Sequence, residues 1–469
     1  EGPTVRMRSL TRRAVFALIS ILVFIFLVST FNSGPPHTWF PNSKSPSKPD
    51  FWDWDTSTRF RTPHAKHSQI ADVDICDSFP TDRLASVQVV LKIGGSEDTE
   101  RLDVLTSTVT RCITNLLIVS DREDVLNGHR VHDVLADLPP SFRARAPDFD
   151  QYEALQRDDP NFEKAAGWRL DRYKFLPMVE YAKLSNPSAQ WFVFLESDTY
   201  FFWDNLFRLL DQFDPAVPLY FGSPSPGHRA KNGDVTWFAY GGVGFVLSAA
   251  AVDKLVHRPV GPNGEFKLPS LTLQDEQLVM DECCGDSVLG WTLFQKGIKL
   301  SGLFPMFNPH PLHGIPFHDS YWCQPVISLH KTSLTDMAGL TKWENNRDRT
   351  DPLLYSDLFE YTRLGELADK EDWDNGEWGG FQDPLESPAH RSFEACRSAC
   401  HDHDRCLSFT YDSTGHCIFV PSMRLGLKKL ISPEVRLSAG WDNEKINSWT
   451  ASHQCPRPHW VKPSITRIF

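Results

Sequence analysis

The chain has 469 residues, which is too long for one small hydrophobic core and suggests two or three domains. Its hydrophobic content of 41% and charged content of 23% are ordinary for a globular protein. The net charge of −12 argues against a nucleic-acid-binding protein, which would show a basic footprint.

The first predicted element is a membrane-spanning helix at residues 14–31, an uninterrupted apolar segment without a charge. Four arginines precede it and the next charge is Lys44, so the positive-inside rule leaves residues 1–13 as a cytoplasmic tail. The alternative is a cleaved signal peptide, but the apolar core is longer than usual and no A-x-A site follows. We therefore expect a retained signal anchor with the rest of the chain in the lumen.

Residues 32–70 are rich in Pro, Ser and Lys and are predicted to form an extended stem. The ten cysteines are compatible with disulfides in a lumenal protein. The chain has no N-x-S/T sequon, so N-glycosylation is not predicted.

A βαβ unit is predicted next, from strands at residues 87–95 and 115–121 with a helix at residues 100–112 between them. Ligands of such sheets bind beyond the carboxyl ends of the strands. This rule places Ser96 and Asp121 near a site.

A helix at residues 167–185 leads into the stretch WFVFLESD, whose residues 191–195 predict a central parallel strand. If the chain stays extended, Glu196 and Asp198 point to one side. The two acids are either solvated at the end of a strand or part of a metal site.

Three further landmarks follow. Residues 238–255 predict a glycine-rich turn and then a helix, and residues 281–300 an acidic turn running into another helix. After Gly365 the composition shifts and a cysteine cluster begins, which indicates a second domain. We expect the two domains at residues 71–365 and 372–455.

Four blocks of the first domain resemble the fringe-like and core-1-type β-1,3-glycosyltransferases (glycosyltransferase family 31). They are LESDTYFFWDNL, WFAYGGVGFVLS, GDSVLGWTLFQKGI and PVISLHK, and they occur in the family's order between about residues 87 and 335. The departures are Glu196, where most relatives have Asp, and Ser197. The resemblance implies a GT-A fold, an α/β architecture with a mixed, mainly parallel sheet flanked by helices.

The resemblance also implies a divalent cation that neutralises the diphosphate leaving group of a UDP-sugar donor. Asp198 and His330 match the metal ligands, and an imidazole beside oxygen ligands suits Mn²⁺ better than Mg²⁺. Glu196 is expected to act through water or hydrogen bonds. A buried structural role is the alternative for His330, and His318 is the reserve ligand.

Asp286 matches the family's catalytic Asp, the base that takes the proton from the acceptor hydroxyl. The resemblance implies that this hydroxyl attacks in line, opposite the departing diphosphate, and so inverts the anomeric carbon. The alternative is that Asp286 only caps the helix that follows it. Asp281 and Glu282 are the remaining candidates for the base.

Donor contacts are expected from residues at or near the ends of the predicted strands, from helix-surface cations and from the glycine-rich turn. Asp121 is placed to meet the uracil or ribose, Arg101 and Lys174 to approach the nucleotide or its phosphates, and Gly241 and Gly242 allow a close backbone approach. The alternatives are a solvated loop acid for Asp121, charges on a helix surface for the two cations, and an ordinary tight turn for the two glycines. Trp237 and Tyr240 either stack on a sugar or pack in the core.

Residues 392–419 resemble a PAN/apple domain, with a C-x3-C-x5-C spacing and a later Cys. The family pattern implies disulfides Cys396–Cys417 and Cys400–Cys406 and a protein or carbohydrate ligand. A zinc site made of cysteines with His401, His403 and His416 is the competing interpretation. The partners of the other six cysteines are not predicted.

Together these features predict a single-pass type II Golgi membrane enzyme that transfers a hexose, with galactose and a β-1,3 linkage favoured, from a UDP-sugar to a glycan or glycoprotein. The alternative is a non-catalytic lectin-like or adhesion protein with a degenerate GT-A head, acting through its PAN/apple module. Glu196 favours the alternative, whereas the set Asp198, Asp286 and His330 favours the enzyme.

Overall fold

A computed structural model describes residues 51–52, 75–159, 162–163, 167–229, 233, 235–376 and 379–464. The predicted tail and anchor, and nearly all of the stem, lie outside the described residues. Within these ranges no helix is both long enough and apolar enough to cross a membrane. Residues Phe51–Trp52 form strand β1, which pairs with β21 (Trp460–Val461) near the other end of the described chain.

The main sheet has eight strands in the order β12-β8-β11-β6-β2-β3-β5-β4. The pairs β12·β8, β6·β2, β2·β3 and β3·β5 are parallel, and the other three are antiparallel, so the sheet is mixed and mainly parallel, as predicted. The strand bounds are β2 (Val87–Lys92), β3 (Leu117–Ser120), β4 (Asp124–Leu126), β5 (His129–Asp133), β6 (Trp191–Glu196), β8 (Tyr220–Gly222), β11 (Phe245–Ser248) and β12 (Ser301–Gly302).

Two details of the predicted sheet are wrong. Strand β6 is central, but only β2 runs parallel to it, and β11 is antiparallel on its other side. The turn-then-helix prediction for residues 238–255 missed β11 itself. The residues of β11 are all buried in the middle of the sheet, and helix α7 (Ala249–Val256) begins only after them.

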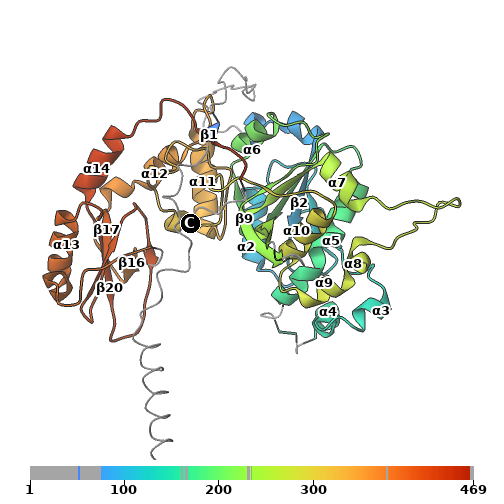
Figure 1. Cartoon of the computed structure of the whole chain (residues 1–469), viewed down its shortest axis with the longest axis horizontal. Coiled ribbons are helices and arrows are strands. Elements are labelled where there is room, and N and C mark those ends of the chain that lie inside the picture. Colours follow the sequence, from blue (N-terminus) through green and yellow to red (C-terminus); the bar gives the residue numbers. More distant parts are fainter. Residues whose placement is uncertain are drawn as a thin grey trace, which may run out of the picture. The chain divides into compact units, whose positions relative to one another are not determined.

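The central strands are apolar because both faces of the sheet are covered. Alternate residues of β6 enter two different cores: Val193 and Leu195 belong to one, Phe192 and Phe194 to the other. This is the burial pattern of a strand in a sheet with helices on both sides. Helices α5 (Gly167–Ser185) and α10 (Gly285–Gln295) lie side by side over one of these faces (Figure 1).

The predicted helices are present, but two of them end earlier than predicted, and one of these is α10, which ends at Gln295 rather than near Leu300. Helix α5 has the predicted bounds, but α2 (Thr99–Ser107) stops before Cys112, which lies in a turn and forms a disulfide with Cys76. The remaining helices of the first domain include α3 (Pro140–Arg143), α4 (Phe149–Gln156), α6 (Trp203–Leu210), α8 (Leu271–Gln274), α9 (Glu276–Asp281), α11 (Leu334–Asn346) and α12 (Tyr355–Thr362).

A second, three-stranded sheet joins distant segments in the order β13-β14-β7. Strand β14 (Ser328–Leu329) is antiparallel to β7 (Tyr200–Phe201), with Leu329 opposite Tyr200. Strand β13 (Phe307–Asn308) runs parallel to β14. Because β14 and β7 are antiparallel, the residues just before β7 lie beside those just after β14.

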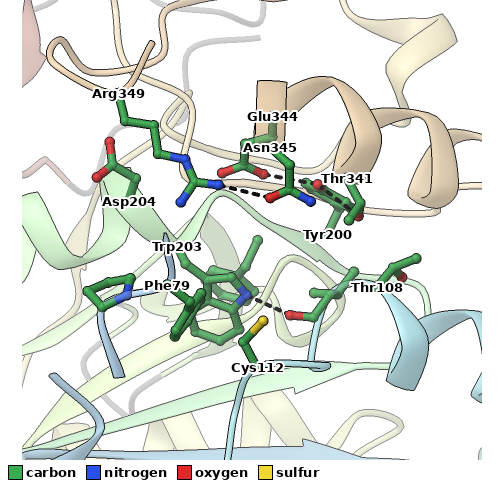
Figure 2. Close-up of a pocket in the computed structure, with 13 residues that line it drawn as sticks. Phe79, Thr108, Cys112, Tyr200, Trp203, Asp204, Thr341, Glu344, Asn345 and Arg349 are labelled. Atoms are coloured by element: carbon green, nitrogen blue, oxygen red, sulfur yellow. Dashed lines mark hydrogen bonds between the residues drawn. The ribbon is translucent and has the colours of Figure 1, made fainter. Parts of the chain in front are cut away.

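Helix α11 is held against β7 around a small cavity of about 40 Å³ (Figure 2). The Tyr200 hydroxyl donates to Oε2 of Glu344 at 3.0 Å, and Trp203 Nε1 donates to the Val109 carbonyl at 2.7 Å. Burial raises the pKa of Glu344 to about 7, against the opposing effect of Arg349. The cavity has room for little more than one water molecule, so it supports the strand rather than binding a sugar or a nucleotide.

The C-terminal domain is built on a four-stranded antiparallel sheet beneath helix α13 (Phe393–Asp402). The predicted disulfides Cys396–Cys417 and Cys400–Cys406 are both present, which removes these cysteines as zinc ligands. No cluster of three potential metal ligands occurs among the described residues. The strands are β15 (Lys370–Glu371), β17 (Ser408–Asp412), β18 (His416–Val420) and β20 (Leu437–Trp441), and α14 (Asn443–Ser452) follows them.

Backbone and disulfide contacts fasten this domain to the first one. Phe317 and Met423 exchange two backbone hydrogen bonds, of 2.9 and 3.0 Å. A disulfide joins Cys323 to Cys455, a pairing that the sequence left open. Trp441 and Ile446 are buried in the same hydrophobic core as residues of the main sheet.

Candidate active site

The candidate site begins where β6 ends. The amide of Thr199 donates to the Glu196 carbonyl at 3.1 Å, so the chain turns directly after the strand. The Thr199 hydroxyl accepts from the Glu196 amide and donates to the Gly242 carbonyl at 2.8 Å, which holds the turn in place. The extended chain that would point Glu196 and Asp198 to one side is therefore absent, and the two acids have different partners.

Asp198 faces His330. Its Oδ2 lies 3.5 Å from Nε2 of His330, and its carbonyl accepts from the amide of Thr332 at 2.9 Å. The antiparallel pairing of β7 and β14 produces this contact, since the two residues lie just outside the paired positions. The ring of Tyr240 meets the imidazole edge to face, with 5.1 Å between ring centroids.

The pair Asp198 and His330 fits a divalent cation. Two donors bound to one cation at bond lengths of about 2.1 Å lie about 3–4 Å apart, and the observed separation is 3.5 Å. Burial lowers the pKa of His330, although Asp198 opposes this, so the neutral imidazole that a metal requires is favoured. Nδ1 of His330 is buried without a hydrogen bond of standard geometry.

Glu196 instead joins a buried charge network with Lys92. The Nζ of Lys92 lies 3.2 Å from Oε1 of Glu196 and 2.5 Å from Oδ2 of Asp171. Burial raises the pKa of Glu196 to about 7, although Lys92 opposes the shift. Burial alone would also raise the pKa of Asp171, but Lys92 and Lys174 lower it to about 2.

The sequence analysis missed Lys92 and Asp171, although each left a signal. Lys92 is the one charge in the strand VQVVLK, and it is only 5% exposed. A lysine is rarely buried without a carboxylate partner. Asp171 lies one helical turn before Lys174, whose Nζ it meets at 3.2 Å.

Asp121 and Lys174 form the next part of the network. Asp121 is buried; it accepts from the Gly95 amide at 2.6 Å and lies 3.2 Å from Nζ of Lys174. Lys174 also donates to the Ile93 carbonyl at 2.9 Å. The structure thus uses Asp121 to hold the loop after β2. Arg101 lies on α2, with its Nε 3.9 Å from Glu97.

A cleft of about 360 Å³ opens at the carboxyl ends of β2 and β6, beside the first turns of α5. This is the edge of the sheet at which the sequence analysis expected a ligand. Neither Asp121 nor Arg101 is among the described lining residues. Those that bear on binding are Lys92, Ser96, Trp168, Asp171, Lys174 and Glu196.

Asp286 lies in the first turn of α10 and is 8% exposed. Its Oδ2 accepts from the amide of Gly241 at 2.8 Å, and its Oδ1 from the amide of Ser287 at 2.9 Å. The N-cap position belongs to Cys284, so Asp286 is not the capping residue of α10. Burial raises the pKa of Asp286, although both amide hydrogen bonds oppose the shift.

Gly241 and Gly242 lie between these acids and the imidazole. A Cβ atom on Gly241 would stand 3.1 Å from Oε1 of Glu196, and one on Gly242 would stand 2.2 Å from Nε2 of His330. The backbone can therefore approach both groups only because these residues are glycines.

The other candidate residues lie around this centre. Glu282 pairs with Nδ1 of His228 at 2.8 Å, and Asp281 accepts from Gln277. Trp237 is half-buried against the hydrophobic core. His318 does not contact Asp198 in any described interaction and instead meets Asp319 at 3.4 Å.

Comparisons with known proteins agree with this architecture. Residues 168–295 match the family model of Fringe-like proteins, and residues 379–434 match the model of the PAN domain. The chain thus contains a region similar to Fringe-like proteins and a C-terminal PAN domain, as the sequence blocks predicted. Asp198, Gly241, Gly242 and Asp286 fall inside the first match, whereas His330 lies beyond it.

Two curated relatives match over 88 residues, or 16% of this chain. The "Fringe glycosyltransferase" of Drosophila melanogaster is 34% identical, and the "Beta-1,3-N-acetylglucosaminyltransferase radical fringe" of Gallus gallus is 33% identical. The match spans only 21% and 24% of their own lengths. A solved glycosyltransferase involved in glycosylation of the major capsid of PBCV-1 is 15% identical, with a TM-score of 0.25, over 54% of this chain and 99% of that one.

Proposed function

We propose that the chain is an inverting glycosyltransferase that transfers a hexose from a UDP-sugar to a glycan or glycoprotein acceptor and depends on Mn²⁺. One observation supports this above all: the Asp198–His330 pair and the buried carboxylate of Asp286 are gathered around the Gly241–Gly242 backbone. The family match and the cleft at the ends of β2 and β6 agree with it.

The donor is proposed to occupy the cleft, with its diphosphate toward Asp198 and His330. A divalent cation bound there supplies positive charge to the departing diphosphate. Lys174 at the back of the cleft lends further positive charge, and Trp168, which is 64% exposed, offers an aromatic face to the nucleotide base.

Asp286 is proposed to accept the proton of the acceptor hydroxyl. The amides of Gly241 and Ser287 fix both of its oxygens, so its position does not depend on solvent. A carboxylate with a raised pKa holds a proton better than an exposed one and is a stronger base. Galactose as the sugar and a β-1,3 linkage are the favoured choices.

Residues 14–31 are proposed to anchor the enzyme in the Golgi membrane, with both domains in the lumen. The support is the apolar run with arginines on one side only. Protease treatment of intact microsomes tests this topology, and digestion of the domains from the cytoplasmic side would reverse it.

The activity is tested with the purified full chain and a panel of UDP-sugars, with and without MnCl₂. The proposal expects one sugar to be turned over in a manganese-dependent way. A binding protein without activity, the alternative that Glu196 favours, should hydrolyse none of the donors. Turnover that is unaffected by a chelator would contradict the role given to the metal.

A further inference from the structure

A groove of about 830 Å³ lies between the two domains, next to the candidate metal ligands. One wall comes from the fringe-like domain, with Pro309, His310 and Lys331 among its residues, and the other from the PAN domain, with Pro421 and Arg424. We call it the interdomain groove. It shares no lining residue with the cleft proposed for the donor.

The groove adjoins the site through two residues. Lys331 directly follows His330, and its backbone is in the left-handed region, with a φ of 53°. Such a conformation is uncommon for a residue with a side chain and often accompanies a functional site. On the other side, Pro309 directly follows Asn308, which pairs with Leu329, the residue before His330, where β13 runs parallel to β14. A ligand in the groove would therefore lie close to the metal ligands.

The wall that the PAN domain supplies is fixed in place. The paired backbones of Phe317 and Met423 lie directly behind it, and the amide of Gly426 donates to the His313 carbonyl at 3.0 Å. Arg424 is 8% exposed, and its Nε donates to the Ser422 hydroxyl at 3.0 Å. Its Nη1 donates to the Gly314 carbonyl at 3.4 Å, so hydrogen bonds hold the guanidinium at the edge of the groove.

The charge of the groove contrasts with that of the whole chain. The chain has a net charge of −12, whereas the described lining residues include two permanent cations, Lys331 and Arg424, and one carboxylate. That carboxylate, Asp319, is already 3.4 Å from Nδ1 of His318. The groove therefore favours a ligand that carries a negative charge.

The remaining lining distinguishes a sugar from a peptide. Four lining residues are prolines, which offer no N–H donors, and the carbonyls of Pro311 and Pro316 also accept from the Gly314 amide and the Tyr321 hydroxyl. A peptide backbone needs donors and acceptors in equal number, whereas sugar hydroxyls can donate to carbonyls throughout. Phe304 and Tyr321 are largely buried, 6% and 5% exposed, so they add a narrow apolar edge to the groove.

We propose that the interdomain groove binds an anionic sugar unit of the acceptor glycan, close to the unit that receives the hexose. This inference rests on the proposed function, because it names the class of acceptor for that same site. It gives the PAN domain a direct part in the choice of acceptor: Arg424 and Lys331 bind the anionic group, and the proline walls accept the hydroxyls.

The test is calorimetry on the full chain with four probes. They are a disaccharide ending in glucuronic acid, the same disaccharide ending in glucose, its sulfate ester, and an acidic peptide. We expect at least one of the two anionic probes, the glucuronide or the sulfate ester, to bind. The neutral disaccharide should bind at least tenfold more weakly than that probe. Equal binding of the neutral probe, or binding of the peptide alone, would overturn the proposal.

Two variants and a control locate the binding. Lys331→Asn removes the charge with a residue that tolerates the left-handed backbone, and Arg424→Lys keeps the charge but loses the planar fork. Each variant should lower the affinity for the anionic probe about tenfold and leave UDP binding unchanged. The control Lys428→Asn, at an exposed position outside the described lining residues, should change neither affinity. Unaltered probe affinity in both groove variants would overturn the assignment. Failure of UDP to bind while the anionic probe still does would refute the proposed function and not the groove.

Discussion

Gly242 lies so close to His330 that a Cβ atom at residue 242 would stand 2.2 Å from the imidazole Nε2. A contact of that length is impossible, so one of the two residues would have to move. The orientation of His330 toward Asp198 therefore depends on the absence of a side chain at residue 242. Gly242 and His330 are far apart in the sequence, yet they pack so closely that one added methyl group would not fit between them.

The first prediction follows from that contact. Gly242→Ala should displace the imidazole, weaken manganese-dependent UDP binding and lower the thermal stability of the protein. In the double variant Gly242→Ala/His330→Ala the clash is relieved, so stability should largely recover while metal-dependent binding stays lost. Thermal unfolding and UDP calorimetry on the three variants measure both effects, and additive losses of stability would show that the contact is unimportant.

The second prediction concerns the proposed metal ligands. Asp198→Ala should abolish manganese-dependent UDP binding, because water replaces a charged ligand poorly. Asp137→Ala, at an exposed position, is the matched control and should leave the affinity unchanged. Calorimetry with UDP in the presence and absence of MnCl₂ checks the change. Wild-type affinity in Asp198→Ala would remove Asp198 from the metal site.

The third prediction separates the base from the metal site. Asp286→Asn retains an oxygen that can accept from the Gly241 amide but loses the proton acceptor. Transfer should fall by roughly 10²–10⁴-fold, the usual contribution of a positioned base, while UDP and manganese still bind. A variant with wild-type turnover would send the search for the base to Glu282 and Asp281.

The raised pKa of Asp286 predicts how the rate of transfer falls at acidic pH. Asp286 acts as a base only when it is deprotonated, and burial raises its pKa above the ordinary value. Transfer should therefore decline, as the pH falls, at a higher pH than an exposed Asp with a pKa of about 3.9 would cause. The residual transfer of Asp286→Asn should lack this decline, and an identical acid limb in both proteins would assign it to another group.

The fourth prediction tests the buried charge network. Lys92→Met leaves Glu196 and Asp171 without their shared cation and should cost about 3 kcal/mol of unfolding free energy, the low end for a broken buried pair, since Lys174 still faces Asp171. Lys183→Met breaks a pair with the exposed Asp253 and should cost less than about 1 kcal/mol. Urea unfolding at neutral pH measures both, and equal losses would contradict the network.

The fifth prediction concerns the PAN domain. Replacing Cys396 and Cys417 with Ser opens a loop with a sequence separation of 21 residues. The entropy of the unfolded chain then rises, and stability should fall by about 3 kcal/mol on the loop-entropy model. Urea unfolding compared with the wild-type chain checks the value. A stability that does not change would mean that packing alone holds α13 on its sheet.

The sequence alone determined the main strands, the long helix and two disulfides of the PAN domain. Strand β6 was predicted because residues 191–195 are all apolar, β2 because most of its residues are apolar, and α5 because its pattern extends over five turns. The PAN disulfides Cys396–Cys417 and Cys400–Cys406 were predicted from the family's cysteine spacing. A spacing within a short stretch of chain can be recognised in the sequence without knowledge of the fold.

Only the tertiary structure decided which groups meet. The pairing of β7 with β14 brings Asp198 to His330, and the turn at Thr199 sends Glu196 to Lys92 instead. The wall that the PAN domain adds to the interdomain groove depends on the Phe317–Met423 contact. Pairings of this kind depend on contacts between residues far apart in the chain, and those contacts form only when the whole core packs. Local sequence patterns predict the secondary structure of each segment, but they do not predict the register in which distant segments pair.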